Sequence, residues 1–403
     1  MVLYLIEFKM NSKERNRFIL LLGLLAMIGP FNIDTCLPAL TQISKELGVT
    51  FQRVEISMSI FFLGFGIGQL FGGYFSDIKG RKWIVSLGLI ISVLGSIVLI
   101  FTPSIEIFYI FRALQGIGAG CVGVSVAAIV RDNFEGNEAA SVMSLVMMIA
   151  MGAPLIAPSI GATFLHFSTW HSIFIFIALY GVFTLVFLQL RLENVIPPKE
   201  NRHSFFKGIK KVYSNKPALG YMAAMAIPSG ALYTYLTTAP FIYQEYFNIP
   251  EKQFALLFGV NGLSLIIMNK LNSKLVLKYS PKKMLNIGLS VHISTLVILL
   301  VSLILFKPNF YFILPMITLH VSTLGFISGN ATTIALEKFD KSLAGLANSQ
   351  MRVVGIIVGS LAGATASTLN NGTLFPPILV MIFCSLLGIF LYTFSERKYK
   401  VIA

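Results

Sequence analysis

Long apolar segments recur along the whole chain, and each is long enough to cross a lipid bilayer. About 18 or more consecutive apolar residues mark a membrane helix. Of the 403 residues, 56% are hydrophobic and only 12% are charged, which is too apolar for one water-soluble core. The sequence therefore predicts an all-α membrane protein with twelve transmembrane helices, at 18–40, 54–76, 83–102, 105–130, 138–165, 170–190, 217–242, 252–269, 284–306, 309–333, 343–369 and 373–395.

The longest predicted connection, 191–216, separates two sets of six spans. It contains Pro197 and Pro198 and a basic segment that is able to form a helix. Translation starts at Met1 or Met10, since both precede the first span. The expected parts are a cytoplasmic N-terminal tail (1–17), an N-terminal six-helix bundle (18–190), a cytoplasmic linker (191–216), a C-terminal six-helix bundle (217–395) and a cytoplasmic tail (396–403).

The positions of Lys and Arg test these spans independently. With the N-terminus in the cytoplasm, the cytoplasmic segments hold 25 of the 31 Lys and Arg residues, and the opposite segments hold 4. Cytoplasmic loops of membrane proteins carry this excess, and a missed span would invert every later loop. We therefore expect both termini on the cytoplasmic side of a bacterial inner membrane. The net charge of +14 then reflects orientation and attraction to anionic lipid, and needs no nucleic acid to explain it.

The loops after the second and eighth spans are alike. In 73–82 the turn residue Gly80 precedes two basic residues, and in 274–283 Pro281 does the same. Transporters built from repeated halves bind their substrates between the halves, near the bilayer midplane. The similarity predicts two pseudo-symmetric bundles with a central substrate site.

Four motifs in the first half carry a family resemblance. They are an acid before Leu-Pro-Ala in 32–40, Gly-x-x-x-Asp-x-x-Gly-Arg-Lys in 73–82, Arg-Ala-Leu-Gln-Gly-Ile-Gly-Ala in 112–119, and Gly-Ala-Pro with a later Pro and Gly in 152–161. Together they resemble the major facilitator superfamily and, within it, the Bcr/CflA branch of drug:proton antiporters. The resemblance implies a proton-coupled exporter of small amphipathic or cationic drugs that works by alternating access.

Two charged residues within the spans are the candidates for proton coupling, Asp34 and Arg112. A charge in hydrocarbon is costly, so such residues are usually functional. Desolvation favours the neutral form of a carboxyl, and a nearby Arg favours the charged form. We expect both side chains in one cavity, with Asp34 changing its protonation as the halves move. The alternatives are that Asp34 caps an irregular helix end near Pro38 and that Arg112 only fixes helix packing.

The remaining candidates form three groups, and for each the simpler alternative is helix packing or orientation charge. The resemblance implies a conformational latch at the cytoplasmic end, in which Asp77 caps a helix of the other half or pairs with Arg131; its residues are Gly73, Asp77, Gly80, Arg81, Lys82 and Arg131. Residues that make the fifth span bendable predict a hinge at Gly152, Pro154, Pro158 and Gly161. The expected substrate cavity is lined by Phe61, Phe65, Gln115, Tyr233, Tyr235, Asn330 and Arg352.

Patterns of other protein classes are missing from the sequence. It has no phosphate-binding loop, no zinc-protease helix and no hydrolase nucleophile elbow, so neither a cofactor, a metal nor enzymatic activity is expected. Export of one endogenous metabolite, such as a siderophore, stays open, and a passive channel or a membrane-embedded enzyme would be a different class. We expect a monomer whose partners are a small-molecule substrate, protons and membrane lipid. His292 and His320 also lie within spans and are expected to be packing residues.

Overall fold

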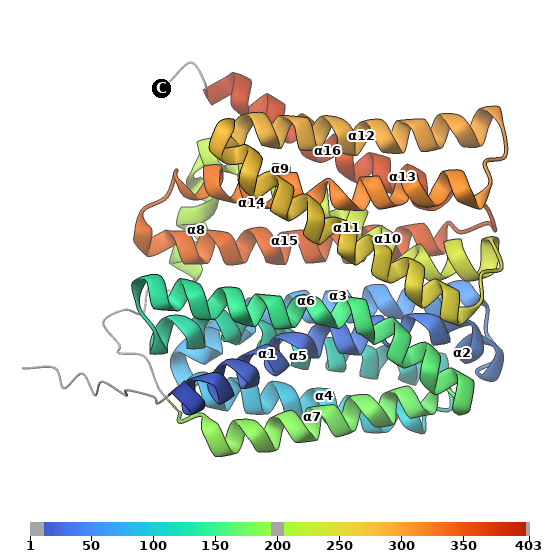
Figure 1. The fold of residues 1–403 in the computed structure, drawn as a ribbon, viewed down its shortest axis with the longest axis horizontal. Helices are drawn as coiled ribbons and strands as arrows, with labels where there is room; N and C mark the ends of the chain where they lie inside the picture. Colours follow the sequence, from blue (N-terminus) through green and yellow to red (C-terminus); the bar gives the residue numbers. More distant parts are fainter. Residues whose placement is uncertain (1–11, 195–204, 400–403) are drawn as a thin grey trace, which may run out of the picture.

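The computed structural model describes residues 12–194 and 205–399, and this part of the chain consists of helices joined by short turns and loops, with no strand (Figure 1). The expectations for residues 1–11, for Pro197 and Pro198, and for residues 400–403 lie outside the described residues.

The first half begins with a span in two pieces, α1 (Ser12–Asp34) and α2 (Leu40–Glu46), joined by the short 3-10 turn η1 (Leu37–Ala39). Five long helices follow: α3 (Phe51–Lys79), α4 (Arg81–Ile100), α5 (Ile105–Asn133), α6 (Gly136–Phe167) and α7 (His171–Arg191). The second half contains α8 (Phe205–Ser214), α9 (Lys216–Ala226), α10 (Ser229–Pro240), the π-helix η3 (Phe241–Tyr246), α11 (Glu251–Lys278), α12 (Pro281–Leu305), α13 (Phe310–Ser322), α14 (Leu324–Leu336), α15 (Lys341–Thr368) and α16 (Phe375–Tyr399).

Within the described residues, eleven helical segments are long and apolar enough to cross a membrane. The pair α9–α10 supplies the twelfth predicted span, although neither helix is long enough alone. The helix of this span is interrupted at Ile227 and Pro228, because a proline has no N–H to donate and its ring clashes with the preceding turn. The prediction of twelve membrane helices is confirmed.

Helix ends differ most from the predicted spans at the eighth span. Hydropathy ends this span at 269, whereas α11 continues to Lys278. The extra turns contain Asn, Ser and Lys residues, which are compatible with a helix but not with hydrocarbon. Hydropathy therefore detects the apolar part of this helix and misses its polar extension.

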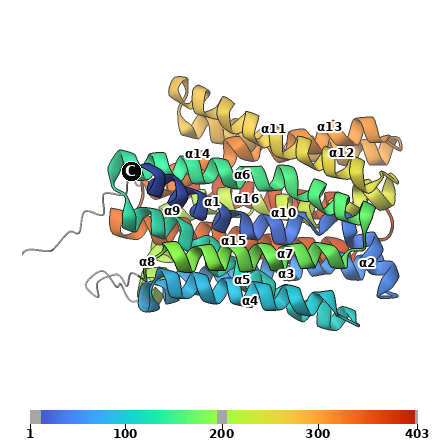
Figure 2. The ribbon, with the colours of Figure 1, turned by 60° about the horizontal axis from the view of Figure 1, so that its bottom comes forward.

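The helices form two bundles. Figure 1 shows α1–α7 in the lower half of the view and α9–α16 in the upper half. Turning the molecule leaves α4 and α11 at opposite margins (Figure 2). The bundles meet where α3 packs along α15 and α6 packs against α11. The predicted arrangement of two six-helix bundles is confirmed.

Glycines allow the helices of the first bundle to pack closely. A Cβ atom added to Gly116 or Gly120 of α5 would clash with the carbonyl oxygens of Phe61 and Phe65 in α3. Small residues permit this backbone-to-backbone packing in membrane proteins. The close contact fixes the position of Arg112, one turn before Gly116 on α5.

Candidate functional site

The two ends of the bundles differ in charge. We call the end that carries Lys79, Lys82, Lys210 and Lys282 the basic end, and the opposite end, which carries Thr41 and Glu245, the distal end. The chain alternates between these ends from helix to helix, and the described residues begin and finish at the basic end (Figure 1).

The two halves are joined at the distal end. Thr41 Oγ1 of α2 donates a hydrogen bond of 2.8 Å to Glu245 Oε1 of η3. Deeper in the molecule, Ser360 Oγ of α15 donates to the Ser59 backbone oxygen of α3 at 2.6 Å. The Ser59 and Thr237 hydroxyls lie 3.4 Å apart. The distal end is therefore closed in this conformation.

Toward the basic end, α6 and α11 separate. Leu155 of α6 lies 3.2 Å from the position that a Cβ on Gly262 of α11 would occupy, midway along the pair. From there α11 runs obliquely away from α6 and reaches α12 (Figure 1). Of the described membrane spans, α6 and α11 are the least buried: only 17% and 22% of their apolar 18-residue segments are buried inside the protein. The crossing at Leu155 therefore marks where the two halves begin to diverge.

Asp34 is the last residue of α1, at the break in the first span. Pro38 lies in the 3-10 turn that follows, where its missing N–H is tolerated. The Asp34 side chain is only 5% exposed. No hydrogen bond or ion pair among the described residues involves its carboxyl, and the nearby polar group is the Tyr235 hydroxyl of α10 in the other half. Asp34 is thus a buried, unpaired acid beside the junction of the halves.

Arg112 of α5 is fully buried and donates to uncharged oxygens. One guanidinium nitrogen donates to the Asn32 backbone oxygen at 2.9 Å and to Gln115 Oε1 at 2.6 Å. The guanidinium carbon lies 4.7 Å from the centre of the Phe61 ring, where a cation is attracted to the aromatic face. Arg112 therefore holds the end of α1, two residues before Asp34, and forms no ion pair with Asp34 in the described residues.

Arg81 is the centre of the predicted latch. It donates to Asp77 at 2.5 Å, to Asp132 of α5 at 2.7 Å and to the Ser76 hydroxyl at 2.9 Å. These contacts join the basic ends of α3, α4 and α5. The expected pairing of Asp77 with Arg131 is not formed, because Arg81 is four residues away across the Gly80 turn and occupies the carboxylate.

The other predicted latch residues lie around this cluster. Arg131 instead points to the second half, 3.7 Å from the position that a Cβ on Gly345 of α15 would occupy. Asp77 is 56% exposed and forms no hydrogen bond or ion pair with the described residues of the second half, so the expected helix cap is not formed in this conformation. Lys82 donates to the Gln189 backbone oxygen of α7 at 3.1 Å, and Gly73 faces Val124 of α5.

The residues predicted to form a hinge lie in one uninterrupted helix, α6, which contains both Pro154 and Pro158. A Cβ atom on Gly161 would clash with the Thr35 backbone oxygen, at the break in the first span. At Gly152 the same added atom would meet nothing within 4 Å. Gly161 therefore couples α6 to the segment that carries Asp34, and Gly152 does not.

Part of the predicted cavity lies at the junction of the halves. The Phe61 and Phe65 rings stack with centres 6.2 Å apart, and Tyr233 of α10 packs edge-on against Phe62 at 4.8 Å. Arg352 of α15 is exposed and lies near Tyr233.

Three other predicted cavity residues form hydrogen bonds within their own bundle. Gln115 Nε2 donates to Ser96 of α4 at 2.8 Å, inside the first bundle. Asn330 Nδ2 donates to Asn272 Oδ1 of α11 at 2.8 Å, inside the second. Tyr235 accepts from Asn261 Nδ2 at 2.6 Å.

Sequence reasoning missed Glu55 of α3, which is completely buried at the distal end. Its signal was available, since Glu55 is an acid inside the second predicted span, 54–76. Asp132 was missed as well, and its role as a partner of Arg81 has no local signal in the sequence.

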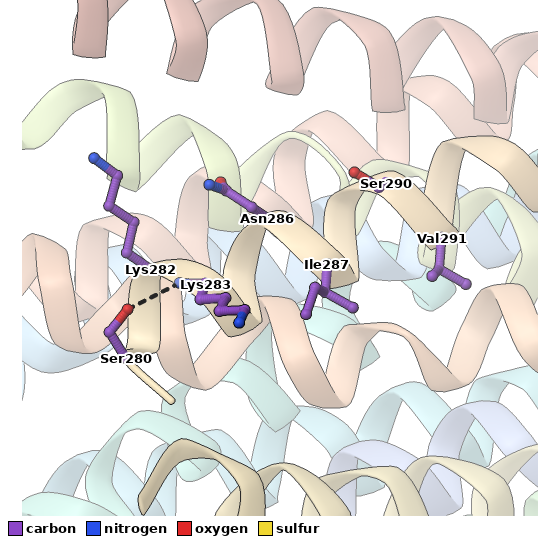
Figure 3. A pocket seen from close by; sticks show the side chains of 7 residues that line it. All are labelled: Ser280, Lys282, Lys283, Asn286, Ile287, Ser290 and Val291. Atoms are coloured by element: carbon purple, nitrogen blue, oxygen red, sulfur yellow. Dashed lines mark hydrogen bonds between the residues drawn. The ribbon is translucent and has the colours of Figure 1, made fainter. Parts of the chain in front are cut away.

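Two further polar features lie away from Asp34. The rings of His292 and His320 stack with centres 4.0 Å apart inside the second bundle, consistent with packing residues. A hollow of about 480 Å³ opens beside α12 at the basic end (Figure 3), lined by Ser280, Lys282, Lys283, Asn286, Ile287, Ser290 and Val291. It belongs to the second bundle's surface and not to the junction of the halves.

Comparison with known proteins decides the family. Residues 21–364 match the family model described as Major Facilitator Superfamily. The chain belongs to the major facilitator superfamily. Superfamily members are transporters of small molecules and not enzymes, and this chain is a multi-pass membrane protein.

Similar proteins agree with the branch that the motifs predicted. The chain is 32% identical over 394 residues to the bicyclomycin resistance protein homolog of Haemophilus influenzae, covering 96% of this chain and 98% of the relative. It is 28% identical to the chloramphenicol resistance protein CraA of Acinetobacter baumannii, over 75% of each chain. The crystal structure of a D-xylose–proton symporter has the same fold, with a TM-score of 0.75, 12% identity and coverage of 95% and 97%. The predicted Bcr/CflA-type membership is confirmed.

Proposed function

We propose that this transporter exports small amphipathic or cationic compounds in exchange for protons, by alternating access. Relatives named for bicyclomycin and chloramphenicol resistance support drug export. The observation that carries proton coupling is the Asp34 carboxyl, buried and unpaired at a broken helix end beside the other half.

Burial makes the charged and neutral forms of Asp34 differ in free energy. A carboxylate without a partner is expensive in a dry site, whereas the neutral acid is tolerated. When the cavity opens and water enters, hydration stabilises the carboxylate and the proton is released. A cationic substrate that approaches Asp34 favours the same release, so substrate and proton exclude each other.

Arg112 contributes by position. Because its guanidinium donates to the Asn32 carbonyl, Arg112 keeps the end of α1 in place while the halves rock. A positive charge near the site also favours release of the proton once the site is hydrated.

The orientation follows from charge. The basic end faces the cytoplasm of a bacterium, because cytoplasmic loops carry the excess of Lys and Arg. The transporter lies in the inner membrane and works as a monomer. The closed distal end then faces outward. One proton that enters across 100 mV releases about 2.3 kcal/mol. Each pH unit adds about 1.4 kcal/mol, enough for a gradient on the order of a hundredfold.

Efflux measurements test this function. We expect cells that lack their own exporters to retain less of several amphipathic drugs when they produce the protein, and a protonophore to abolish the difference. Asp34→Asn should lose proton-driven efflux, and the exposed distal Glu251→Gln should keep it. Full efflux by the Asp34→Asn protein would disprove the assignment.

The same panel separates the other readings. Export of one endogenous metabolite would show as protonophore-sensitive efflux of that compound with no drug transported. A channel would show single-channel conductance and no accumulation against a gradient.

A further inference from the structure

A second buried acid lies at the distal junction of the halves, 21 residues after Asp34. Glu55 of α3 is 0% exposed, and neither carboxyl oxygen has a well-formed hydrogen bond. The side chains of Ser367, at the end of α15, and of Asn370 just beyond it stand opposite. The Ser367 hydroxyl is itself buried without a partner.

The groups around Glu55 offer no positive charge. Glu245 of η3 is the charged residue that faces Glu55 from the second half, and it is another acid. From α5, Arg112 reaches Met58, one turn along α3, but its hydrogen bonds go to Asn32 and Gln115.

The other nearby charges are also engaged or distant. Arg53, two residues before Glu55, pairs with Glu106 of α5 at 2.7 Å. Glu46 of α2 accepts from the Trp170 indole at 2.6 Å. Lys45 of α2 is exposed and has no interaction with Glu55. The Glu55 site is therefore built of neutral groups and one further carboxylate.

This arrangement favours the neutral acid, because a buried carboxylate that faces no cation is strongly destabilised. Ser367 and Asn370 can each donate to a carboxylate, but both are neutral. A neutral carboxyl has in addition an O–H of its own to donate, which the unpaired Ser367 hydroxyl opposite can accept. When α3 moves away from α15, water reaches the carboxyl, and a hydrated glutamate ionises at neutral pH. Closure of the distal end is thus tied to uptake of one proton.

We propose that Glu55 is a proton-binding gate residue, which takes a proton from the distal side before the distal end closes and returns it to that side when the end opens. The inference rests on the alternating access proposed above, but not on proton coupling through Asp34. It assigns the two acids different tasks: Asp34 exchanges its proton for substrate, and Glu55 makes closure of the distal end depend on distal pH.

Distances across the distal end test the gate. Spin labels at Thr50→Cys and Lys252→Cys report on opposite halves, since both residues are exposed and neither side chain forms a hydrogen bond or ion pair within the described residues. The buried native cysteines, Cys36, Cys121 and Cys384, are replaced by alanine. For the full chain in nanodiscs, we expect the long-distance population to grow at least fivefold between pH 5 and pH 9. Glu55→Gln should hold the short distance throughout.

Controls separate this proposal from the transport mechanism. Glu55→Met should also hold the short distance at every pH, and it buries no amide. It therefore serves as the test if the Glu55→Gln protein does not fold. Glu251→Gln, an exposed acid at the same end, should respond to pH as the parent protein does. Asp34→Asn should also keep the response, even if it no longer transports. An unchanged pH response in Glu55→Gln or Glu55→Met, or its loss in Asp34→Asn alone, would overturn the gate.

Discussion

At the scale of single residues, the first bundle contains a buried cation held by neutral oxygens. Arg112 donates from one guanidinium nitrogen to both Asn32 and Gln115, reaches Met58 Sδ with another, and places its planar face over Phe61. A lysine at this position would keep the charge but lose the second nitrogen and the planar group that stacks on the ring. The role of Arg112 therefore depends on its shape as well as its charge.

Arg112→Lys should lower both stability and transport. The lost hydrogen bonds leave the Gln115 amide oxygen or the Asn32 carbonyl unsatisfied, which costs about 1–3 kcal/mol. We expect a lower thermal midpoint in detergent and at least tenfold slower efflux. Arg53→Lys, at an exposed pair with Glu106, should change little. Equal stability of the two variants would show that the guanidinium contacts of Arg112 do not stabilise the fold.

The sequence draws attention to a buried charge where that charge interrupts an apolar span, and not where it lies near a span end. Asp34 and Arg112 stood out because a charge is rare in the middle of an apolar span. Glu55 did not, because an acid in the first turn of a span is ordinary when that end is hydrated. The acid itself is visible in the sequence, but its burial under α15 depends on a contact between distant segments, which has no local signal.

At the scale of helices, the broken first span is the centre of the site. The break between Asp34 and Leu37 is held by α6, which passes the Thr35 carbonyl at Gly161. Hydropathy predicted the span and Pro38 indicated an irregularity, but the partner helix follows from tertiary packing alone. The same holds for Arg81, whose bond to Asp132 joins the start of α4 to the end of α5, 51 residues apart in the sequence.

Two glycines of α6 provide a matched test of this contact. Gly161→Ala places a methyl group against the Thr35 carbonyl, so we expect displacement of the break and at least tenfold slower transport. Gly152→Ala adds the same group in open space and should be neutral or stabilise the helix by about 1 kcal/mol. Efflux rates and thermal midpoints of both variants decide the point. Similar behaviour of the two would mean that α6 does not control the Asp34 segment.

At the scale of the whole molecule, the conformation is closed at the distal end and divergent between α6 and α11 toward the basic end. The twelve spans and the two bundles could be predicted, because apolar length and the Lys and Arg excess act on every span alike. Which end is closed could not, because it depends on contacts between the halves, such as the bond from Thr41 to Glu245.

A cysteine pair across the distal end tests alternating access. The Thr41 and Glu245 side chains are in hydrogen-bond contact, so a short bifunctional methanethiosulfonate reagent should join Thr41→Cys to Glu245→Cys. We expect the cross-link to stop transport and a reductant to restore it, as judged by efflux and gel mobility. Each single cysteine variant should transport normally after the same treatment. Continued transport by the cross-linked protein would argue against alternate opening of this end.

Proton exchange at Asp34 is the central claim, and the most direct measurement is proton release on substrate binding. Purified protein in weakly buffered detergent solution is mixed with a cationic substrate found in the efflux panel, and the released protons are followed with a pH-sensitive dye. Coupling through Asp34 predicts about one proton per bound substrate for the parent protein and for Glu251→Gln, and none for Asp34→Asn that still binds substrate. Equal release from Asp34→Asn would contradict it.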